Sequence, residues 1–203
     1  MKVGVLAVQG DFAAHRRALV AGGADAVLVR TPRELAAVGA LVLPGGESTA
    51  MLHALARDGL EAPLAAYLAS GRAVLGTCAG AILLARRVSN PPQRSFAALD
   101  VDVERNAYGT QLDSFAAWPD AGSRADVAAA PAVFIRAPRI VRVGPRVEVL
   151  ATVRGDPVLV REGAVWAATF HPELAAASAV HDAWLAASRS AGRSPASSGP
   201  TSR

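Results

Sequence analysis

The only cysteine of the chain, Cys78, lies between two glycines in the sequence GTCAG (76–80). An apolar run before it, AVLGT (73–77), predicts a buried strand, and the residues after it predict a helix. A tight strand-to-helix turn of the form Gly-x-nucleophile-x-Gly places its central side chain at a helix N-terminus, where N–H groups and the helix dipole favour a thiolate. On this interpretation Cys78 is a nucleophile, and the Ala79 N–H points to the place where an oxyanion develops. The alternative is that Cys78 is an inert, buried side chain beside the apolar AILLA segment (81–85).

His171 is the histidine best placed to act as a base for such a nucleophile. It follows the apolar run AVWAATF (164–170) directly, at the carboxyl end of a predicted strand, where α/β sheets place their ligand sites. Pro172 should keep the next residues extended, so that His171 and Glu173 point to the same side. A carboxylate that accepts the imidazole N–H fixes its tautomer and stabilises the imidazolium. The alternative is a simple strand-to-helix turn in which Glu173 is favourable near a helix start.

The remaining histidines, His15, His53 and His181, fall within predicted helices. His15 and His53 are expected on surface helices, and His181 is expected in the last helix. We therefore expect solvent-facing or helix-capping roles for all three.

A third candidate element is LPGGESTAM (43–51), which again begins at the end of a predicted strand. Two adjacent glycines allow backbone N–H groups to approach a ligand closely, so the Gly46 N–H could be a second oxyanion donor. Glu47, Ser48 and Thr49 offer hydrogen-bond acceptors and a helix cap. Alone, a Gly-Gly turn before a capped helix is also common as an ordinary connection between a strand and a helix, without any binding role.

Apolar runs and helical segments alternate through the first half of the chain. The runs are rich in valine and leucine and lack polar alternation, which is typical of parallel strands covered on both faces. The predicted strands are 2–8, 26–29, 40–44 and 73–77. Predicted helices start near Phe12 and Thr31, cover 48–57 and 61–70, and continue over 78–88. This order predicts an α/β fold with three layers, a mostly parallel central sheet and flanking helices.

The second half contains closely spaced strands separated by Gly and Pro turns. The spacing leaves no room for crossover helices, so additional antiparallel strands are expected here. The predicted strands are 99–105, 132–136, 139–143, 147–153, 157–163 and 164–170. With a last helix near 175–187, we expect one domain over 1–187 and a disordered tail, rich in Ser, Pro and Gly, over 188–203.

The composition is that of a single globular domain. Of 203 residues, 52% are hydrophobic, which is enough for a sizeable core. One cysteine forms neither an internal disulfide nor a paired-cysteine metal site, and this favours a cytoplasmic protein without a metal. The apolar N-terminal run stops at Asp11, so it predicts a buried strand rather than a signal peptide or a membrane span. Because three arginines of the tail contribute to the net charge of +4, we expect neither nucleic-acid nor membrane binding.

Taken together, LPGGEST, GTCAG and FHPE, in this order and at strand ends, resemble the motifs of class I, triad-type glutamine amidotransferases. Further segments narrow the likeness to the glutaminase subunits of pyridoxal 5′-phosphate synthase, from Val3 to about Trp184. These segments are GVLAVQGD (4–11), LPGGESTAM (43–51), GTCAGAILLA (76–85), DVERNAYGTQLDSF (102–115) and VFIRAP (133–138). The last two are the specific ones, because the triad motifs alone also fit the glutaminases of imidazole, purine or tryptophan synthesis.

The resemblance implies a Cys-His-Glu triad of Cys78, His171 and Glu173, with the N–H groups of Gly46 and Ala79 as oxyanion donors. It also implies a glutamine site lined by Gly46, Glu47, Ser48, Arg105, Ile135 and Arg136. The two arginines match the charge of an amino-acid carboxylate. Without the motif context, arginines at strand ends are more often solvated or paired with a surface acid.

The activity that the resemblance implies is hydrolysis of L-glutamine to L-glutamate and ammonia through a glutamyl thioester, without a metal or cofactor. In this family the ammonia passes through a protein channel to a separate barrel-shaped synthase subunit, which builds pyridoxal 5′-phosphate from ribose 5-phosphate and glyceraldehyde 3-phosphate. The glutaminase is poorly active until the synthase docks. We therefore expect a synthase partner in a large multi-subunit complex.

The sequence departs from the family pattern at two places. Thr110 stands where the family usually has arginine, and FAALD (96–100) lacks the glycine usual before the leucine of that strand. Three other functions stay open. They are a glutaminase subunit of another synthase, such as imidazole glycerol phosphate synthase, a non-catalytic regulatory module of the same fold, and a peptidase or deglycase of related cysteine-elbow folds. The last class as a rule lacks the FHPE pair.

Overall fold

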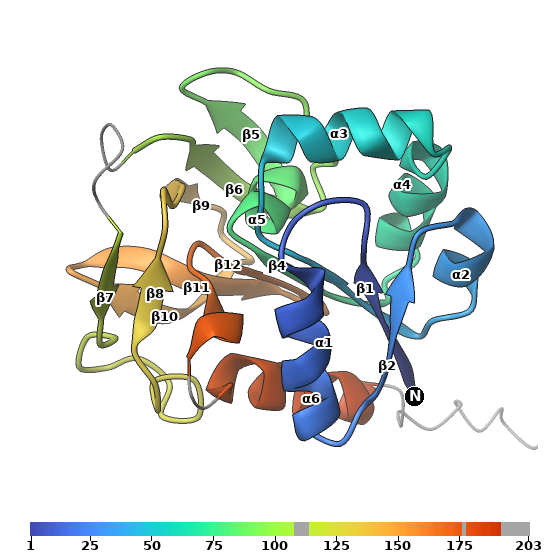
Figure 1. Cartoon of the computed structure of the whole chain (residues 1–203). Coiled ribbons are helices and arrows are strands. Elements are labelled where there is room, and N and C mark those ends of the chain that lie inside the picture. Colours follow the sequence, from blue (N-terminus) through green and yellow to red (C-terminus); the bar gives the residue numbers. More distant parts are fainter. Residues whose placement is uncertain (108–113, 176–177, 192–203) are drawn as a thin grey trace, which may run out of the picture.

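A central seven-stranded sheet organises the protein, as a computed structural model that describes residues 1–107, 114–175 and 178–191 shows (Figure 1). The strand order is β10-β11-β12-β4-β3-β1-β2. Five neighbouring strands, from β12 to β2, run parallel, whereas β10 and β11 are antiparallel. The strands are β1 (Lys2–Leu6), β2 (Asp25–Val29), β3 (Ala40–Leu43), β4 (Ala73–Thr77), β10 (Glu148–Val153), β11 (Asp156–Glu162) and β12 (Val165–Ala168).

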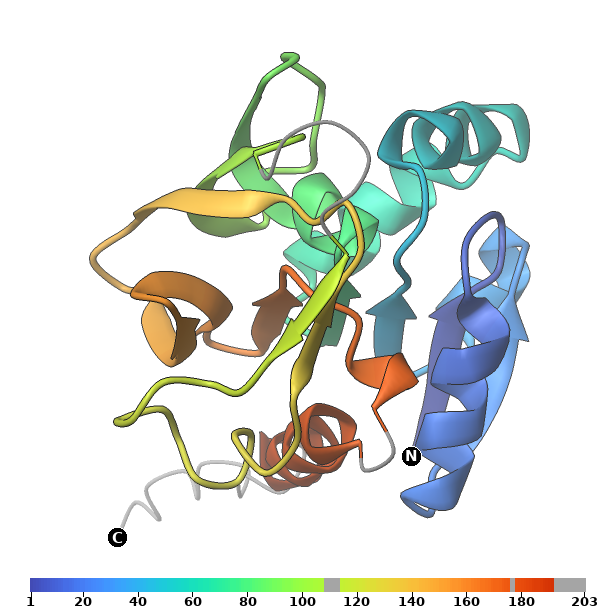
Figure 2. The ribbon, with the colours of Figure 1, turned by 60° about the vertical axis from the view of Figure 1, so that its left-hand side comes forward.

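Helices cover both faces of this sheet, which confirms the predicted three-layer α/β fold (Figures 1 and 2). On one face lie α1 and α6, and on the other lie α2, α3, α4 and α5. Their bounds are α1 (Phe12–Ala21), α2 (Pro32–Ala36), α3 (Ser48–Arg57), α4 (Glu61–Ala69), α5 (Ala79–Leu84) and α6 (Ala179–Ala191). A single 3₁₀ turn, η1 (Pro172–Leu174), lies between β12 and α6.

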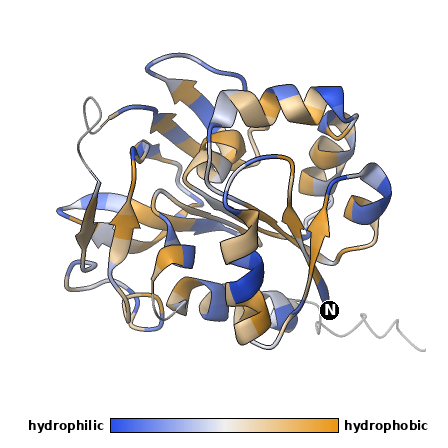
Figure 3. Cartoon of the chain, viewed as in Figure 1, coloured by the Kyte–Doolittle hydropathy of each residue, from blue (hydrophilic) through white to orange (hydrophobic). Residues whose placement is uncertain are grey.

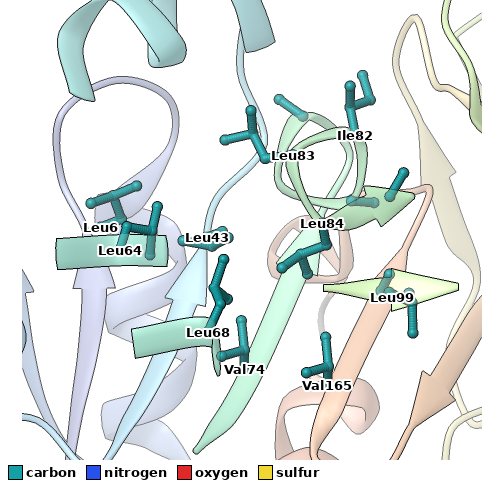
Figure 4. Packing of buried hydrophobic residues seen from close by; sticks show 14 of the residues in the cluster. Leu6, Leu43, Leu64, Leu68, Val74, Ile82, Leu83, Leu84, Leu99 and Val165 are labelled. Atoms are coloured by element: carbon teal, nitrogen blue, oxygen red, sulfur yellow. The ribbon is translucent and has the colours of Figure 1, made fainter. Parts of the chain in front are cut away.

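The unbroken apolar runs of the parallel strands follow from this double coverage. In β3, Leu41 and Leu43 pack into the core under α3 and α4, while Ala40 and Val42 pack into the core under α1 and α6. Because successive strand residues point to opposite faces, a strand covered on both sides needs an apolar residue at every position. The strands at the centre of Figure 3 are accordingly hydrophobic along their length, and Figure 4 shows the packing of one core from strand and helix residues.

Two smaller sheets stand beside the central one. The first has the order β5-β6-β9, and the second is the pair β7-β8. Their strands are β5 (Ala85–Ser89), β6 (Leu99–Glu104), β7 (Phe115–Ala117), β8 (Ala132–Phe134) and β9 (Arg139–Val143). The antiparallel pairs β6-β9 and β7-β8 agree with the expectation for the second half, whereas β5 and β6 pair in parallel.

Two predicted elements need correction. The helix after Cys78 ends at Leu84, and ARRVS (85–89) is strand β5 because its backbone pairs with β6. The last helix spans Ala179–Ala191, so residues 188–191, assigned above to the tail, are helical. Ser188 is buried, and its hydroxyl donates to the Trp184 carbonyl at 2.8 Å. Residues 192–203 lie outside the described part, and so does Thr110.

No helix in the described ranges is long and apolar enough to cross a membrane.

The other departure from the family pattern, in FAALD, has a structural consequence at Ala97. This residue has φ +52°, in the left-handed region, where a Cβ costs about 1 kcal/mol or more. We expect Ala97→Gly to raise the free energy of unfolding by about 0.5–1 kcal/mol, the strain relief outweighing the extra entropy of an unfolded glycine. Thermal and urea unfolding measure this.

The matched control for that variant is the neighbour Ala98, whose φ is not positive. Ala98→Gly should lower the free energy of unfolding, since glycine there adds entropy to the unfolded chain without relieving strain. Equal effects of the two substitutions would show that Ala97 is not strained.

Candidate active site

Cys78 occupies the turn between β4 and α5. Its backbone has φ +47° and ψ −104°, a strained conformation for a residue with a side chain. The Cys78 N–H donates to the Ala168 carbonyl at 2.8 Å, and the Cys78 carbonyl accepts from the Ile82 N–H at 3.2 Å. The turn is thus held between β12 and the first turn of α5, and it has the form of a nucleophile elbow.

The two glycines of GTCAG are required by close packing. A Cβ on Gly76 would lie 2.7 Å from the backbone of Gly80, and one on Gly80 would lie 2.1 Å from the Leu43 carbonyl oxygen. Both distances are too short for real contacts. The glycines therefore let α5 start directly above β3 and β4, as the tight-turn interpretation predicted.

The structure brings His171 and Glu173 together. His171 Nδ1 lies 2.7 Å from Glu173 Oε1, and both side chains are largely buried. The expected extended geometry is wrong, because Pro172 begins the 3₁₀ turn η1. This tight turn, rather than an extended segment, places the carboxylate beneath the imidazole. The backbone N–H of His171 donates to the Val133 carbonyl at 2.8 Å, which fixes the start of the turn.

Cys78 and His171 meet over Gly45. A Cβ on Gly45 would lie 2.4 Å from His171 Cε1 and 3.3 Å from Cys78 Cβ. Burial lowers the pKa of His171, but hydrogen bonds to Cys78 and to Glu173 outweigh burial and raise the pKa to about 10. His171 is therefore protonated at neutral pH, beside the side chain of Cys78.

Glu173 is a buried carboxylate that stays ionised. Burial raises the pKa of Glu173, but hydrogen bonds with His15 and His171 outweigh it and hold that pKa well below its usual range. The negative charge beneath the imidazole stabilises its protonated form, as the predicted base and orienter require.

Two histidines are placed differently from our expectation. His15 and His181 are fully buried, and they lie behind Glu173 rather than facing solvent or capping a helix. A signal was available in the helical spacing. His15 shares a face of α1 with Leu19, and His181 shares a face of α6 with Trp184, both of which are buried. His53 is exposed on α3, as expected.

A cavity of ≈ 270 Å³ opens at Cys78 and His171. The structure places there all six residues that the resemblance assigns to the glutamine site: Gly46, Glu47, Ser48, Arg105, Ile135 and Arg136. Four further residues line the cavity and were not predicted: Gln9, Ile82, Asn106 and Pro138. All four lie inside the motif segments GVLAVQGD, GTCAGAILLA, DVERNAYGTQLDSF and VFIRAP, and that position was a usable signal.

Glu47 and its neighbours form a rim of this cavity. The Glu47 carboxylate caps α3 by accepting from the N–H groups of Thr49 and Ala50, at 3.0 and 2.6 Å, as the capping interpretation predicted. Arg105 Nη2 lies 3.4 Å from the same carboxylate. The Glu47 N–H donates to Gln9 Oε1 at 3.0 Å, which joins the loop after β1 to this rim.

The remaining predicted residues have simple positions. Ser48 is buried, and its hydroxyl donates to Gln93 Oε1 at 2.9 Å. Ala79 is the buried first residue of α5. Arg136 is exposed and has φ +44°. Among the described residues, no group of three or more His, Cys, Asp or Glu side chains is arranged to hold a metal ion.

Known proteins share this architecture and this sequence. Residues 5–188 match the SNO glutamine amidotransferase family. The chain is 50% identical over 188 residues to the pyridoxal 5′-phosphate synthase subunit PdxT of Koribacter versatilis, covering 91% of this chain and 94% of that protein. It is 48% identical over 176 residues to PdxT of Thermotoga maritima, covering 86% and 92%.

Solved structures agree with these relatives. A crystal structure of a glutamine amidotransferase superposes with a TM-score of 0.84 at 41% identity, over 92% of this chain and 98% of that one. The structure of PurLQS from Thermotoga maritima shares the fold alone, with a TM-score of 0.63 at 16% identity, over 95% and 99% of the two chains. The chain belongs to the SNO glutamine amidotransferase family.

Proposed function

We propose that this protein is a glutaminase that hydrolyses L-glutamine to L-glutamate and ammonia through a thioester on Cys78. One observation carries the proposal. A cysteine on a strained strand-to-helix turn lies beside a histidine over Gly45, and a buried carboxylate holds that histidine at 2.7 Å. This arrangement has the parts that nucleophilic acyl transfer needs, and it opens onto a cavity of ≈ 270 Å³.

The first half-reaction forms the thioester. The Cys78 sulfur attacks the side-chain amide carbon of glutamine, and negative charge develops on the carbonyl oxygen. The N–H groups of Gly46 and Ala79 are the proposed donors to this oxygen. As the carbon–nitrogen bond breaks, the protonated His171 gives its proton to the nitrogen, which leaves as ammonia.

The second half-reaction releases glutamate. His171, now neutral and still oriented by Glu173, accepts a proton from water as the water attacks the thioester carbon. The carbon–sulfur bond breaks, Cys78 regains its thiolate form, and His171 is again protonated. The charge of Glu173 stabilises this imidazolium in both half-reactions.

The cavity rim fits the amino-acid end of the substrate. Arg105 and Arg136 supply positive charge for the α-carboxylate, and arginine pairs well with carboxylates. Gly46, Glu47, Ser48 and Ile135 line the rest of the site. These binding roles, like those of the triad, are part of the proposal.

The names of the relatives indicate what the ammonia is for. Relatives at about half identity are named as subunits of pyridoxal 5′-phosphate synthase, so we propose that a separate synthase subunit is the partner that consumes the ammonia. A complex with many copies of both subunits and a cytoplasmic location belong to the same proposal. A single domain followed by a tail likewise stays a prediction, with its last helix ending at Ala191 rather than at residue 187.

The test is a glutaminase assay with and without the synthase subunit from the same source. Ammonia release should be slow for the glutaminase alone and at least tenfold faster with the synthase, with pyridoxal 5′-phosphate formed from ribose 5-phosphate and glyceraldehyde 3-phosphate. An imidazole glycerol phosphate synthase subunit is the control partner and should not stimulate the rate. The glutaminase would belong to another pathway if the control subunit stimulated ammonia release while the synthase subunit from the same source formed no pyridoxal 5′-phosphate with this protein.

A further inference from the structure

A chain of buried polar side chains continues beyond Glu173, away from the substrate cavity. Its members His15, Thr77 and His181 have exposed fractions of 0%. His15 Nε2 lies 3.2 Å from Glu173 Oε2, and His15 Nδ1 lies 2.8 Å from His181 Nε2. The hydroxyl of Ser178 contacts His181 Nδ1. The catalytic steps above use none of these groups, although buried polar side chains are costly unless they are paired.

Glu173 needs a partner for each of its two oxygens. Oε1 accepts from His171 Nδ1 at 2.7 Å. Oε2 is fully buried and has no hydrogen-bond partner among the described residues. His15 Nε2 lies 3.2 Å from this oxygen and 3.0 Å from Thr77 Oγ1. Removing His15 would take away this contact and leave a buried carboxylate oxygen more poorly compensated.

One set of proton positions along this chain turns a donor toward Glu173 Oε2. The Ser178 hydroxyl donates to His181 Nδ1, the His181 Nε2–H donates to His15 Nδ1, and the His15 Nε2–H faces Glu173 Oε2. Burial lowers the pKa of His181 to about 3, which keeps its ring neutral, as this arrangement requires. The direction of the hydrogen bonds therefore presents a proton of His15 to the carboxylate.

Three separate segments of the chain hold this arrangement. His15 comes from α1, Glu173 from the turn η1, and His181 from α6. Figure 2 shows η1 beside α1 and next to α6, the two helices that carry these histidines. Thr77 is the last residue of β4, immediately before Cys78, and it ties His15 to the nucleophile turn as well.

We propose that His15 is a positioning residue of this active site: it holds the second oxygen of Glu173 and, kept in one tautomer by His181 and Ser178, sets the orientation of His171 against Cys78. The inference rests on the proposed glutaminase function. It adds a fourth member, on α1, to the predicted triad and two further members behind it. The triad is thus anchored on both helices of one face of the sheet.

The test compares two replacements of His15. His15→Gln can still place an amide N–H near the position of Nε2, whereas His15→Leu fills the space without a donor. With the synthase subunit present, we expect His15→Leu to lower kcat for glutamine about 10–100-fold, with KM changed less than threefold, because small misplacements of catalytic groups are costly. His15→Gln should recover at least a tenth of the wild-type kcat. The control is His53→Leu, on the exposed face of α3, which should leave both constants unchanged.

A second measurement does not depend on glutamine. Iodoacetamide should alkylate Cys78 at pH 7 more slowly in His15→Leu than in the wild type, and His15→Gln should restore most of the rate. In a Glu173→Gln background the same His15→Leu change should have little further effect, because the carboxylate that His15 holds is gone. If His15→Leu unfolds, His15→Asn replaces it, since its shorter amide cannot reach Glu173.

The outcomes separate the two proposals. A wild-type protein that releases no ammonia would refute the glutaminase proposal, while alkylation still reports on His15. His15 would only fill space if His15→Leu and His15→Gln lowered kcat equally. The same conclusion would follow if His15→Leu slowed alkylation of Cys78 just as much in the Glu173→Gln background as in the wild type. The proposal would also be overturned if His15→Leu had the same alkylation rate and the same kcat as the wild type.

Discussion

Replacement of Cys78 by alanine is expected to abolish glutamine hydrolysis, with a fall in kcat of roughly 10⁴-fold or more. No other group can form the thioester, because Cys78 is the only cysteine of the chain. His171 and Glu173 would remain in place, but they can only move protons. Release of ammonia, measured with the synthase subunit present, is the readout.

The fold should survive this change. Alanine keeps the Cβ and can adopt the same strained turn, so the melting temperature should stay within a few degrees of the wild type. Cys78→Ser is the sharper comparison, since it keeps the shape but replaces the sulfur with a hydroxyl, which is a much weaker nucleophile. A Cys78→Ala protein that kept more than a hundredth of the wild-type rate would refute the thioester mechanism.

Gly80→Ala should strongly lower the stability of the fold. The added Cβ would lie 2.1 Å from the Leu43 carbonyl oxygen and 2.9 Å from Leu43 Cβ. The neighbour is backbone of β3, which is paired on both sides with β1 and β4 and cannot move alone. We expect a loss of about 3 kcal/mol or more in the free energy of unfolding, seen as a melting temperature lower by roughly 6–12 °C. Glutaminase activity should fall as well, because α5 carries Cys78 at its start.

Gly39→Ala is the matched control. Its φ is not in the left-handed region, and a Cβ there would lie 3.0 Å from Cγ of Met1, an exposed and flexible side chain that can turn away. This variant should melt close to the wild type. If Gly80→Ala had the same melting temperature as Gly39→Ala, α5 would not pack on β3 as tightly as the distances indicate.

Much of the fold could be predicted because its signals are local. The strands β1 to β4 are apolar except at the end residues Lys2, Asp25 and Thr77, and a strand covered on both faces requires such a pattern. The helix starts at Asp11 and Thr31 were visible from side chains that cap their own backbone. The turn at Cys78 was visible from its glycines.

Local signals failed where pairing partners decide the structure. ARRVS (85–89) continues a helical pattern in the sequence, yet it is a strand because β6, ten residues further on, offers its edge. The extended geometry expected after His171 was wrong for a related reason. Proline also suits the first position of a 3₁₀ turn, and contacts with α1 and α6 select that conformation.

The residue order alone specifies the chemistry of this protein, since a cysteine between glycines, a histidine after a strand and a glutamate two residues later can be identified without coordinates. Only the tertiary structure decides what surrounds that chemistry. His15 and His181 are 166 residues apart, yet their ring nitrogens lie 2.8 Å from one another. No helical periodicity brings α1 and α6 to the same carboxylate. Their meeting at Glu173 results from the order of the strands in the sheet, which buries both helices on one face.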